Sequence, residues 1–161
     1  MADLVRANEI ANEAHEGVLD KCGEPYIYHP RRVRDKVFSQ KAKMVAILHD
    51  VVEDTGWTLD DLRKEGFEED VVLGIDGMTR RVDESYMQFI RRLSENDLSV
   101  EVKVFDIADN TDLNRIPKGN EDWFYKNREG KYKKALKFLM PQYEKIKEKQ
   151  DNFSVKKNNL F

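Results

Sequence analysis

Apolar residues recur along most of this chain at intervals of three and four positions and rarely alternate with polar ones. This spacing is typical of α-helices that bury one face. Glycine and proline are scarce, at eight and four residues, so few breaks interrupt the pattern. The sequence therefore predicts an all-α fold, a compact bundle of about seven to eight helices.

The breaks between apolar runs divide the chain into successive helices. Thr58 is expected to cap one of them, because its hydroxyl can accept hydrogen bonds from free amides of the first turn. Gly66 is expected to end the same helix. We predict helices at residues 2–19, from residue 29 onward, and at residues 41–54, 59–64, 68–79, 84–93, 99–113 and 122–149.

The length of 161 residues, 40% of them hydrophobic, suits one domain and leaves little material for a second core. We assign that domain to residues 1–150, with its motifs between residues 14 and 115 and its last helix at residues 122–149. Residues 151–161 are expected to form a flexible tail.

Charged residues make up 37% of the chain, against about 25% in an ordinary globular protein. The net charge is only −3, but residues 1–100 hold 14 basic and 21 acidic residues, while residues 101–161 hold 14 and 10. Two interpretations stay open. Either an acidic metal pocket adjoins a basic phosphate-binding surface, or the last helix merely has a solvated face rich in lysine.

Cys22 is the single cysteine, which excludes an intramolecular disulfide and any multi-thiolate zinc motif. The N-terminus lacks the apolar core of a signal peptide, and no run approaches the roughly 18 apolar residues that span a bilayer. We expect a cytoplasmic protein with no membrane partner. No basic surface interleaved with aromatic residues predicts nucleic-acid binding. The pattern leaves the oligomeric state open.

The most apolar predicted helix, residues 41–54, contains an unusual group of ionisable side chains. Because residues four apart share a helix face, His49 is expected over Glu53 and Asp50 over Asp54. The two stripes are adjacent. All four side chains can therefore border one cavity.

Burying these groups without compensation would cost several kcal/mol per charge, of roughly 5–15 kcal/mol that stabilises a domain. A divalent cation would neutralise them, and His29 and Asp106 are further donors of suitable chemistry. Two imidazoles and two carboxylates can hold Mn, Fe, Co or Zn. Alternatively, His49 is a hydrogen-bonded core histidine and Glu53 and Asp54 form an ordinary solvated helix end.

Several segments resemble those of one known family. Residues 23–30, GEPYIYHP, and residues 49–55, HDVVEDT, match two of its elements, and residues 76–80, DGMTR, and 103–110, KVFDIADN, are similar to two more. In this order and spacing, the chain resembles the HD-domain metal-dependent phosphohydrolases over roughly residues 7–115. Within them it resembles the Rel/Spo-type (p)ppGpp hydrolases, in a short stand-alone bacterial form.

The resemblance implies a role for each residue that matches a family motif. It implies a divalent metal, usually Mn²⁺, and a small-molecule nucleotide substrate. Glu53 and Asp54 would be the catalytic pair that serves the hydrolytic water. The implied metal ligands are His29, His49, Asp50 and Asp106, and the implied substrate-binding residues are Lys21, Arg80, Asn110 and Lys131.

The resemblance further implies hydrolysis of (p)ppGpp at its 3′-pyrophosphate by a metal-activated water. Asp20 stands where many members have an arginine that packs against guanine, and Asp109 stands where they have a histidine. Another nucleotide, a dNTP or a nucleoside monophosphate, is therefore the alternative substrate, and a non-catalytic nucleotide-binding module is the alternative class. The chain after the HD motifs is too short for the family's synthetase module. His15 and Tyr132 are expected to pack rather than to bind ligands.

Overall fold

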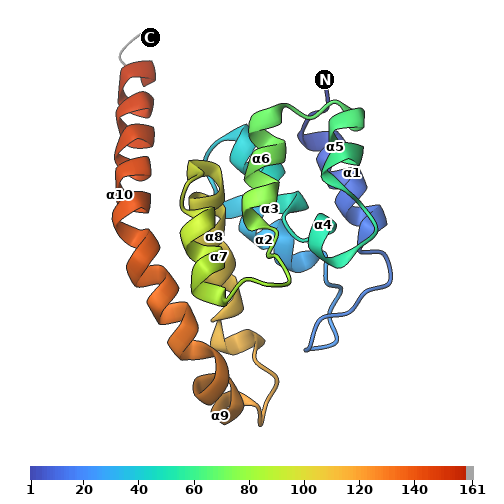
Figure 1. Ribbon diagram of the computed structural model, residues 1–161, viewed down its shortest axis with the longest axis vertical. Coiled ribbons are helices and arrows are strands. Elements are labelled where there is room, and N and C mark those ends of the chain that lie inside the picture. Colours follow the sequence, from blue (N-terminus) through green and yellow to red (C-terminus); the bar gives the residue numbers. More distant parts are fainter. Residues whose placement is uncertain (159–161) are drawn as a thin grey trace.

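The structure, a computed structural model, describes residues 1–158, which fold into helices joined by short loops (Figure 1). Within these residues two segments, α4 and α9, are single turns, and no strand is present beyond one isolated bridge between Leu19 and Pro25. The predicted all-α fold is confirmed. The helices are α1 Leu4–Ala14, α2 Tyr28–Lys36, α3 Gln40–Leu48, α4 Val51–Asp54, α5 Leu59–Glu65, α6 Glu69–Met78, α7 Tyr86–Leu93, α8 Asp97–Asn110, α9 Glu121–Phe124 and α10 Gly130–Asn158, with a 3-10 turn at Leu113–Arg115 and a π-helix at Tyr125–Glu129.

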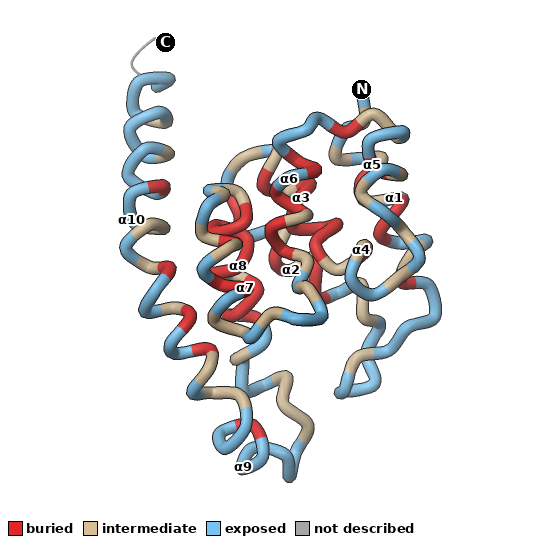
Figure 2. Tube along the Cα trace, viewed as in Figure 1, coloured by how far each residue is buried: buried red, intermediate tan, exposed pale blue. Residues whose placement is uncertain are grey.

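Helix α3 lies at the centre of the bundle, where it contacts α1, α2, α6 and α8. Figure 2 shows that buried residues concentrate on these central helices. Full burial of one Leu or Ile side chain stabilises a fold by about 1.5–3 kcal/mol, so this apolar helix is the main organiser of the core. Its buried residues are Ala42, Met44, Val45, Ala46, Ile47 and Leu48.

Side-chain caps define where several helices begin, as the sequence predicted for α5. Thr58 accepts a hydrogen bond from the Asp61 amide, and Asp61 in turn accepts from the Thr58 amide. Gly66 ends this helix with φ at 94°, a left-handed conformation that glycine adopts without steric cost. Ser85 and Gln88 form the same reciprocal box at the start of α7.

The first helix ends at Ala14, before the predicted end at residue 19, because Gly17 adopts a left-handed φ of 73°. The following segment is a loop. The Asp20 carboxylate stabilises it by accepting hydrogen bonds from the backbone N–H groups of Cys22 and Glu24, at 2.8 and 3.0 Å. This loop reaches the pocket described below.

The prediction of one continuous helix over residues 41–54 is wrong at one point. Helix α3 ends at Leu48 and α4 begins at Val51, because Asp50 has φ −98° and ψ −6° and interrupts the helical geometry. His49 and Asp50 thus occupy a tight corner between two helices. Their side chains can therefore approach a common point more closely than neighbours on a regular helix.

The predicted last helix, residues 122–149, is in fact α9, the π-helical turn and α10. Helix α10 runs along one side of the bundle and continues to Asn158, so most of the predicted tail at residues 151–161 is helical. No glycine or proline follows Pro141 to end this helix, and Gln150 Nε2 donates to Glu101 Oε2 at 3.0 Å. Residues 159–161 of that tail lie outside the described residues.

Two glycines allow α6 to pack closely against its neighbours. A Cβ atom on Gly74 would lie 2.7 Å from Val45 Cγ2 of α3, and one on Gly77 would overlap Ser99 Oγ of α8. Ser99 uses this closeness, because its hydroxyl donates to the Gly74 carbonyl at 2.8 Å. The two glycines therefore allow α6 to approach α3 and α8 as closely as observed.

We expect Gly77→Ala to lower the free energy of unfolding by about 1–3 kcal/mol, because the added methyl group overpacks the α6–α8 contact. Gly130→Ala is the control. Gly130 is helical and has no atom near its would-be Cβ, so this change should leave stability unchanged or raise it by about 0.5–1 kcal/mol. Urea denaturation of both variants measures the difference, and equal stability of Gly77→Ala and wild type would contradict the packing argument.

Candidate functional site

The four predicted metal ligands come from three separate elements and meet at one point. His29 lies on α2, His49 and Asp50 form the α3–α4 corner, and Asp106 lies on α8. His29 Nε2 is 3.0 Å from Asp106 Oδ1 and 3.7 Å from Asp50 Oδ2. His49 Nε2 is 3.0 Å from Asp50 Oδ2 and 3.5 Å from Asp106 Oδ1. Two nitrogens and two carboxylates thus face a common centre.

The Nδ1 atom of each imidazole contacts an oxygen outside the centre. His29 Nδ1 lies 2.6 Å from Asp109 Oδ2, and His49 Nδ1 lies 2.6 Å from the Ala46 carbonyl oxygen. This leaves both Nε2 atoms facing the centre. His49 Nε2 is buried and has no hydrogen-bond partner among residues 1–158. An orphaned nitrogen beside two carboxylates fits a divalent metal, and ligand atoms of His29, His49 and Asp50 all lie within 4.8 Å of one another.

The electrostatics of the centre also favour a cation. Burial alone lowers the pKa of His29, but its hydrogen bonds to Asp106 and Asp109 outweigh burial and raise that pKa to about 9. Burial likewise opposes charge on His49, yet the Asp50 and Asp106 carboxylates raise its pKa well above the usual value. The carboxylates therefore stabilise positive charge at this point, whether a proton or a metal ion supplies it.

Neighbouring donors hold the two carboxylates in place. The Tyr26 hydroxyl donates to Asp50, Lys103 Nζ donates to Asp106 Oδ2 at 2.7 Å, and Asn110 Nδ2 donates to Asp106 Oδ1 at 3.0 Å. Sequence reasoning missed Tyr26 and Lys103. For Lys103 the available signal was a lysine three residues before Asp106 within an apolar stretch.

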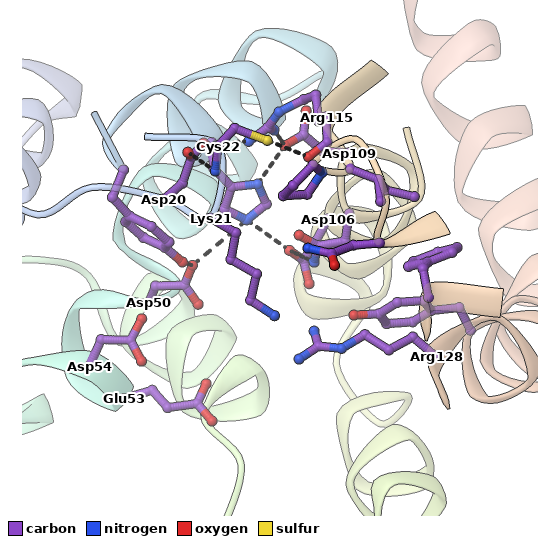
Figure 3. Close-up of a pocket in the computed structure, with 18 of the residues that line it drawn as sticks. Asp20, Lys21, Cys22, Asp50, Glu53, Asp54, Asp106, Asp109, Arg115 and Arg128 are labelled. Atoms are coloured by element: carbon purple, nitrogen blue, oxygen red, sulfur yellow. Dashed lines mark hydrogen bonds and ion pairs between the residues drawn. The ribbon is translucent and has the colours of Figure 1, made fainter. Parts of the chain in front are cut away.

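His29, Asp50 and Asp106 of this centre form one wall of a pocket of about 1020 Å³. Glu53 and Asp54 both line it, and Figure 3 shows them beside Asp50. Both are exposed, as at an ordinary helix end, but they border the metal-ligand cluster. Partial burial, followed by the nearby charge of Asp50, raises the pKa of each carboxyl.

Positively charged side chains gather on another side of the pocket. Lys21, Arg80 and Lys131, three of the predicted substrate-binding residues, line it together with Arg128. Lys21, Arg128 and Lys131 form no ion pair with a carboxylate within residues 1–158, and Figure 3 shows Lys21 and Arg128 directed toward the same space. Burial, and then repulsion from Arg128 and other cations, lowers the pKa of Lys131. Mutually repelling cations without carboxylates favour an anionic ligand.

Asn110, the fourth predicted substrate-binding residue, lines the pocket through α8 while it bonds Asp106. Of the predicted site residues, all but His49 line this pocket, and the Nε2 of His49 lies 3.0 Å from Asp50 Oδ2 in its wall. Sequence reasoning missed Arg128, which the π-helical turn before α10 presents to the pocket, and Trp123, whose ring centroid lies 5.4 Å from Lys21 Nζ and 5.3 Å from Arg128 Cζ. Neither belongs to a motif that the sequence displays.

Tyr132 and His15 both pack against aromatic neighbours, as expected, and Tyr132 also lines the pocket. Tyr132 is buried and packs edge-on against Tyr86, with ring centroids 6.1 Å apart. His15 is buried beside the Tyr26 ring, with centroids 5.0 Å apart, and is not among the groups that meet at the centre. Lys131 Nζ lies 4.6 Å from the Tyr86 centroid, so the aromatic cluster also positions a cation of the pocket.

Asp20, a residue that departs from the family motif, forms an ion pair and hydrogen bonds within the chain. Its Oδ2 lies 3.1 Å from Arg115 Nη2, and its Oδ1 accepts from the Cys22 amide. The carboxylate therefore stabilises the loop that carries Lys21.

The ion pair Glu84–Arg92 joins the loop between α6 and α7 to α7 and holds the backbone that contacts Arg80. Arg92 Nη2 donates to Glu84 Oε2 at 2.9 Å. The same carboxylate also accepts a hydrogen bond from the Arg81 amide at 2.9 Å. The Glu84 carbonyl in turn accepts from Arg80 Nη2 at 3.0 Å. The Glu84–Arg92 pair thus fixes the backbone that orients Arg80.

No protein-family model matches the chain. The chain is 30% identical over 166 residues to the guanosine-3′,5′-bis(diphosphate) 3′-pyrophosphohydrolase of Aquifex aeolicus, a match that covers 96% of this chain and 22% of that protein. It is 37% identical over 84 residues to a GTP pyrophosphokinase of Streptomyces coelicolor, covering 50% of this chain and 10% of that protein. The chain therefore spans less than a quarter of the length of these curated relatives.

A solved structure of a metazoan ortholog of SpoT, described as hydrolysing ppGpp and playing a role in starvation responses, has the same fold. The TM-score is 0.66 at 22% identity, over 86% of each chain. The solved structure shows that the all-α fold is shared. The relatives support the resemblance seen in the sequence: the chain is similar to HD-domain proteins of the Rel/Spo hydrolase type.

The pH dependence of stability tests the Glu84 ion pair. The hydrogen bond from Arg92 is the main cause that lowers the pKa of Glu84 from 4.5 to about 2. A carboxyl whose pKa is lower in the folded state stabilises the fold above pH 4.5 and loses this contribution as the pH falls toward 2. Glu84→Gln should therefore be less stable than wild type at pH 7, and the difference should vanish near pH 2. Denaturant titrations across this range measure it, and a pH-independent difference would refute the ion pair's role.

Proposed function

We propose that this protein is a metal-dependent phosphohydrolase that removes the 3′-pyrophosphate of (p)ppGpp. The convergence of His29, His49, Asp50 and Asp106 on one centre beside a partly cationic pocket carries this proposal. The printed name of the Aquifex aeolicus relative, a 3′-pyrophosphohydrolase, supports the reaction.

The four convergent side chains would hold the metal, and we propose that this metal is Mn²⁺. When bound, a divalent cation neutralises phosphate oxygens and makes a water molecule more acidic. The buried Tyr26 and Lys103 contacts keep Asp50 and Asp106 in position, so the chain would not need to rearrange its carboxylates on binding.

Glu53 and Asp54 would handle protons in the proposed reaction. They lie at the edge of the pocket beside Asp50, accessible to water and to a substrate, yet they are not among the four convergent groups. One carboxylate would accept the proton of the attacking water, and a proton would be returned to the leaving oxygen.

The cations suit a nucleotide with phosphates at two positions. A bis(diphosphate) can present one diphosphate to the metal centre while the other meets cations of the pocket. Lys21, Arg128 and Lys131 have no carboxylate partner within residues 1–158 and would bind these phosphate oxygens, with Arg80 beside them.

One observation favours a second candidate substrate. Asp20 is paired with Arg115 and offers no guanidinium to a guanine base, unlike the arginine that the resemblance assigns to this position. A dNTP or a nucleoside monophosphate is therefore the alternative. A monophosphate would leave more of the cations uncompensated, which favours the bis(diphosphate).

A substrate panel tests the choice. With Mn²⁺ present, we expect purified protein to release pyrophosphate from ppGpp and pppGpp, and to process dNTPs and nucleoside monophosphates more slowly. Chromatography of the products identifies the bond cleaved. Turnover of a dNTP without turnover of ppGpp would sink the (p)ppGpp proposal and leave the phosphohydrolase class standing.

Two substitutions separate binding of the metal from catalysis. His49→Ala should lose metal because it removes an inward-facing nitrogen, whereas Glu53→Gln should retain metal and lose about 10²–10⁴-fold in turnover. Glu69→Gln, an exposed carboxylate of α6 paired with Arg63, serves as control and should change neither property. Metal analysis and initial rates measure both. Normal hydrolysis by both variants would overturn the site assignment, and circular dichroism checks that each is folded.

A further inference from the structure

Asp109 is a buried carboxylate, 3% exposed, that the proposed chemistry does not use. Three donors surround it. His29 Nδ1 lies 2.6 Å from its Oδ2, Arg32 Nε donates to its Oδ1 at 2.8 Å, and Arg115 Nη1 donates to its Oδ2. A buried carboxylate is costly unless it is paired and hydrogen-bonded, and two guanidinium groups supply that compensation.

The contact with Asp109 determines which nitrogen of His29 faces the centre. With Nδ1 committed to Asp109, the ring presents Nε2 to the centre, 3.0 Å from Asp106 and 3.7 Å from Asp50. His49 also presents Nε2 to the centre, but its Nδ1 contacts the neutral carbonyl of Ala46. The two imidazoles thus have the same orientation toward the centre and different supports, one uncharged and one anionic.

We propose that Asp109 is a positioning residue that fixes the tautomer and orientation of His29 and strengthens it as a metal ligand. The inference rests on the proposed function, which makes this centre a metal site. A carboxylate behind a ligating histidine holds the ring and raises its basicity, and losing such a partner typically weakens metal binding by about 10–100-fold.

The hydrogen-bond pattern makes one substitution especially informative. Both oxygens of Asp109 accept: Oδ1 from Arg32 Nε, and Oδ2 from His29, from Arg115 and from Arg32 Nη2 at 3.3 Å. An asparagine keeps the shape but must aim its NH₂ group at one of these donors. Asp109→Asn therefore cannot satisfy both sides.

Arg115 extends the support to the loop that carries Lys21. Its Nη2 lies 3.1 Å from Asp20 Oδ2, and its carbonyl accepts from Cys22 Sγ at 2.8 Å. Figure 3 shows Arg115 near both Asp20 and Asp109. Asp20→Asn thus perturbs the same arginine without touching His29, which makes it a matched control.

Calorimetric titration of the metal-free protein with Mn²⁺, and separately with Zn²⁺, tests the proposal. We expect Asp109→Asn to weaken binding by about 10–100-fold and Asp20→Asn by no more than about two-fold. Thermal melts without metal check that both variants fold. A merely structural role for Asp109 would lower the melting temperature and leave metal affinity unchanged.

A spectroscopic measurement on the wild type does not depend on the variant folding. In the Zn²⁺-bound protein, ¹⁵N NMR of the His29 ring should show Nδ1 protonated and Nε2 bearing the metal. A wild type that binds neither metal would overturn the proposed function. A wild type that binds metal while Asp109→Asn binds equally, or whose His29 binds through Nδ1, would overturn this inference alone.

Discussion

Charge compensation inside an apolar bundle is the constraint on which the rest of this structure depends. Helix α3 and its neighbours form a closely packed core, yet Asp50, Asp106 and two imidazoles meet within it. Buried charges destabilise a fold unless opposite charges or hydrogen bonds accompany them. The carboxylates at the centre accordingly accept hydrogen bonds from Tyr26, Lys103 and Asn110. Within residues 1–158 the buried Nε2 of His49 has no hydrogen-bond partner, and a cation at this point would compensate the charge of the carboxylates.

The supports of the centre are drawn from the same helices that build the core. The break between α3 and α4 turns His49 and Asp50 inward together, and Lys103, one turn before Asp106 on α8, balances the carboxylate it contacts. Asp109 and its two arginines then extend the network from His29 to the surface. Packing and site geometry are therefore coupled: the close approach of α6 to α3 and α8, which Gly74 and Gly77 allow, helps to place the helix that carries Asp106 and Asp109.

The uneven distribution of charge along the chain acquires a physical meaning in the pocket. Carboxylates from the acidic first hundred residues form one wall, and Arg128 and Lys131 from the basic remainder face the same space. The metal-pocket interpretation of the charge pattern thus accounts for part of the asymmetry. The other interpretation also holds, because most lysines of α10 remain on its exposed face.

The sequence by itself was enough to establish the all-α class, the capping of α5, and the residues that gather at the centre, because helical periodicity and motif spacing are local properties. It misplaced the ends of α1 and α10 and missed the break at Asp50, since those depend on single backbone angles and on contacts with distant helices. Arg115 and Asp20 are 95 residues apart, and no local pattern signals that they pair or that Asp109 supports His29. Only the tertiary structure decided these partners, because a buried charge is stabilised by whatever folding brings next to it, and that choice is made across the whole chain.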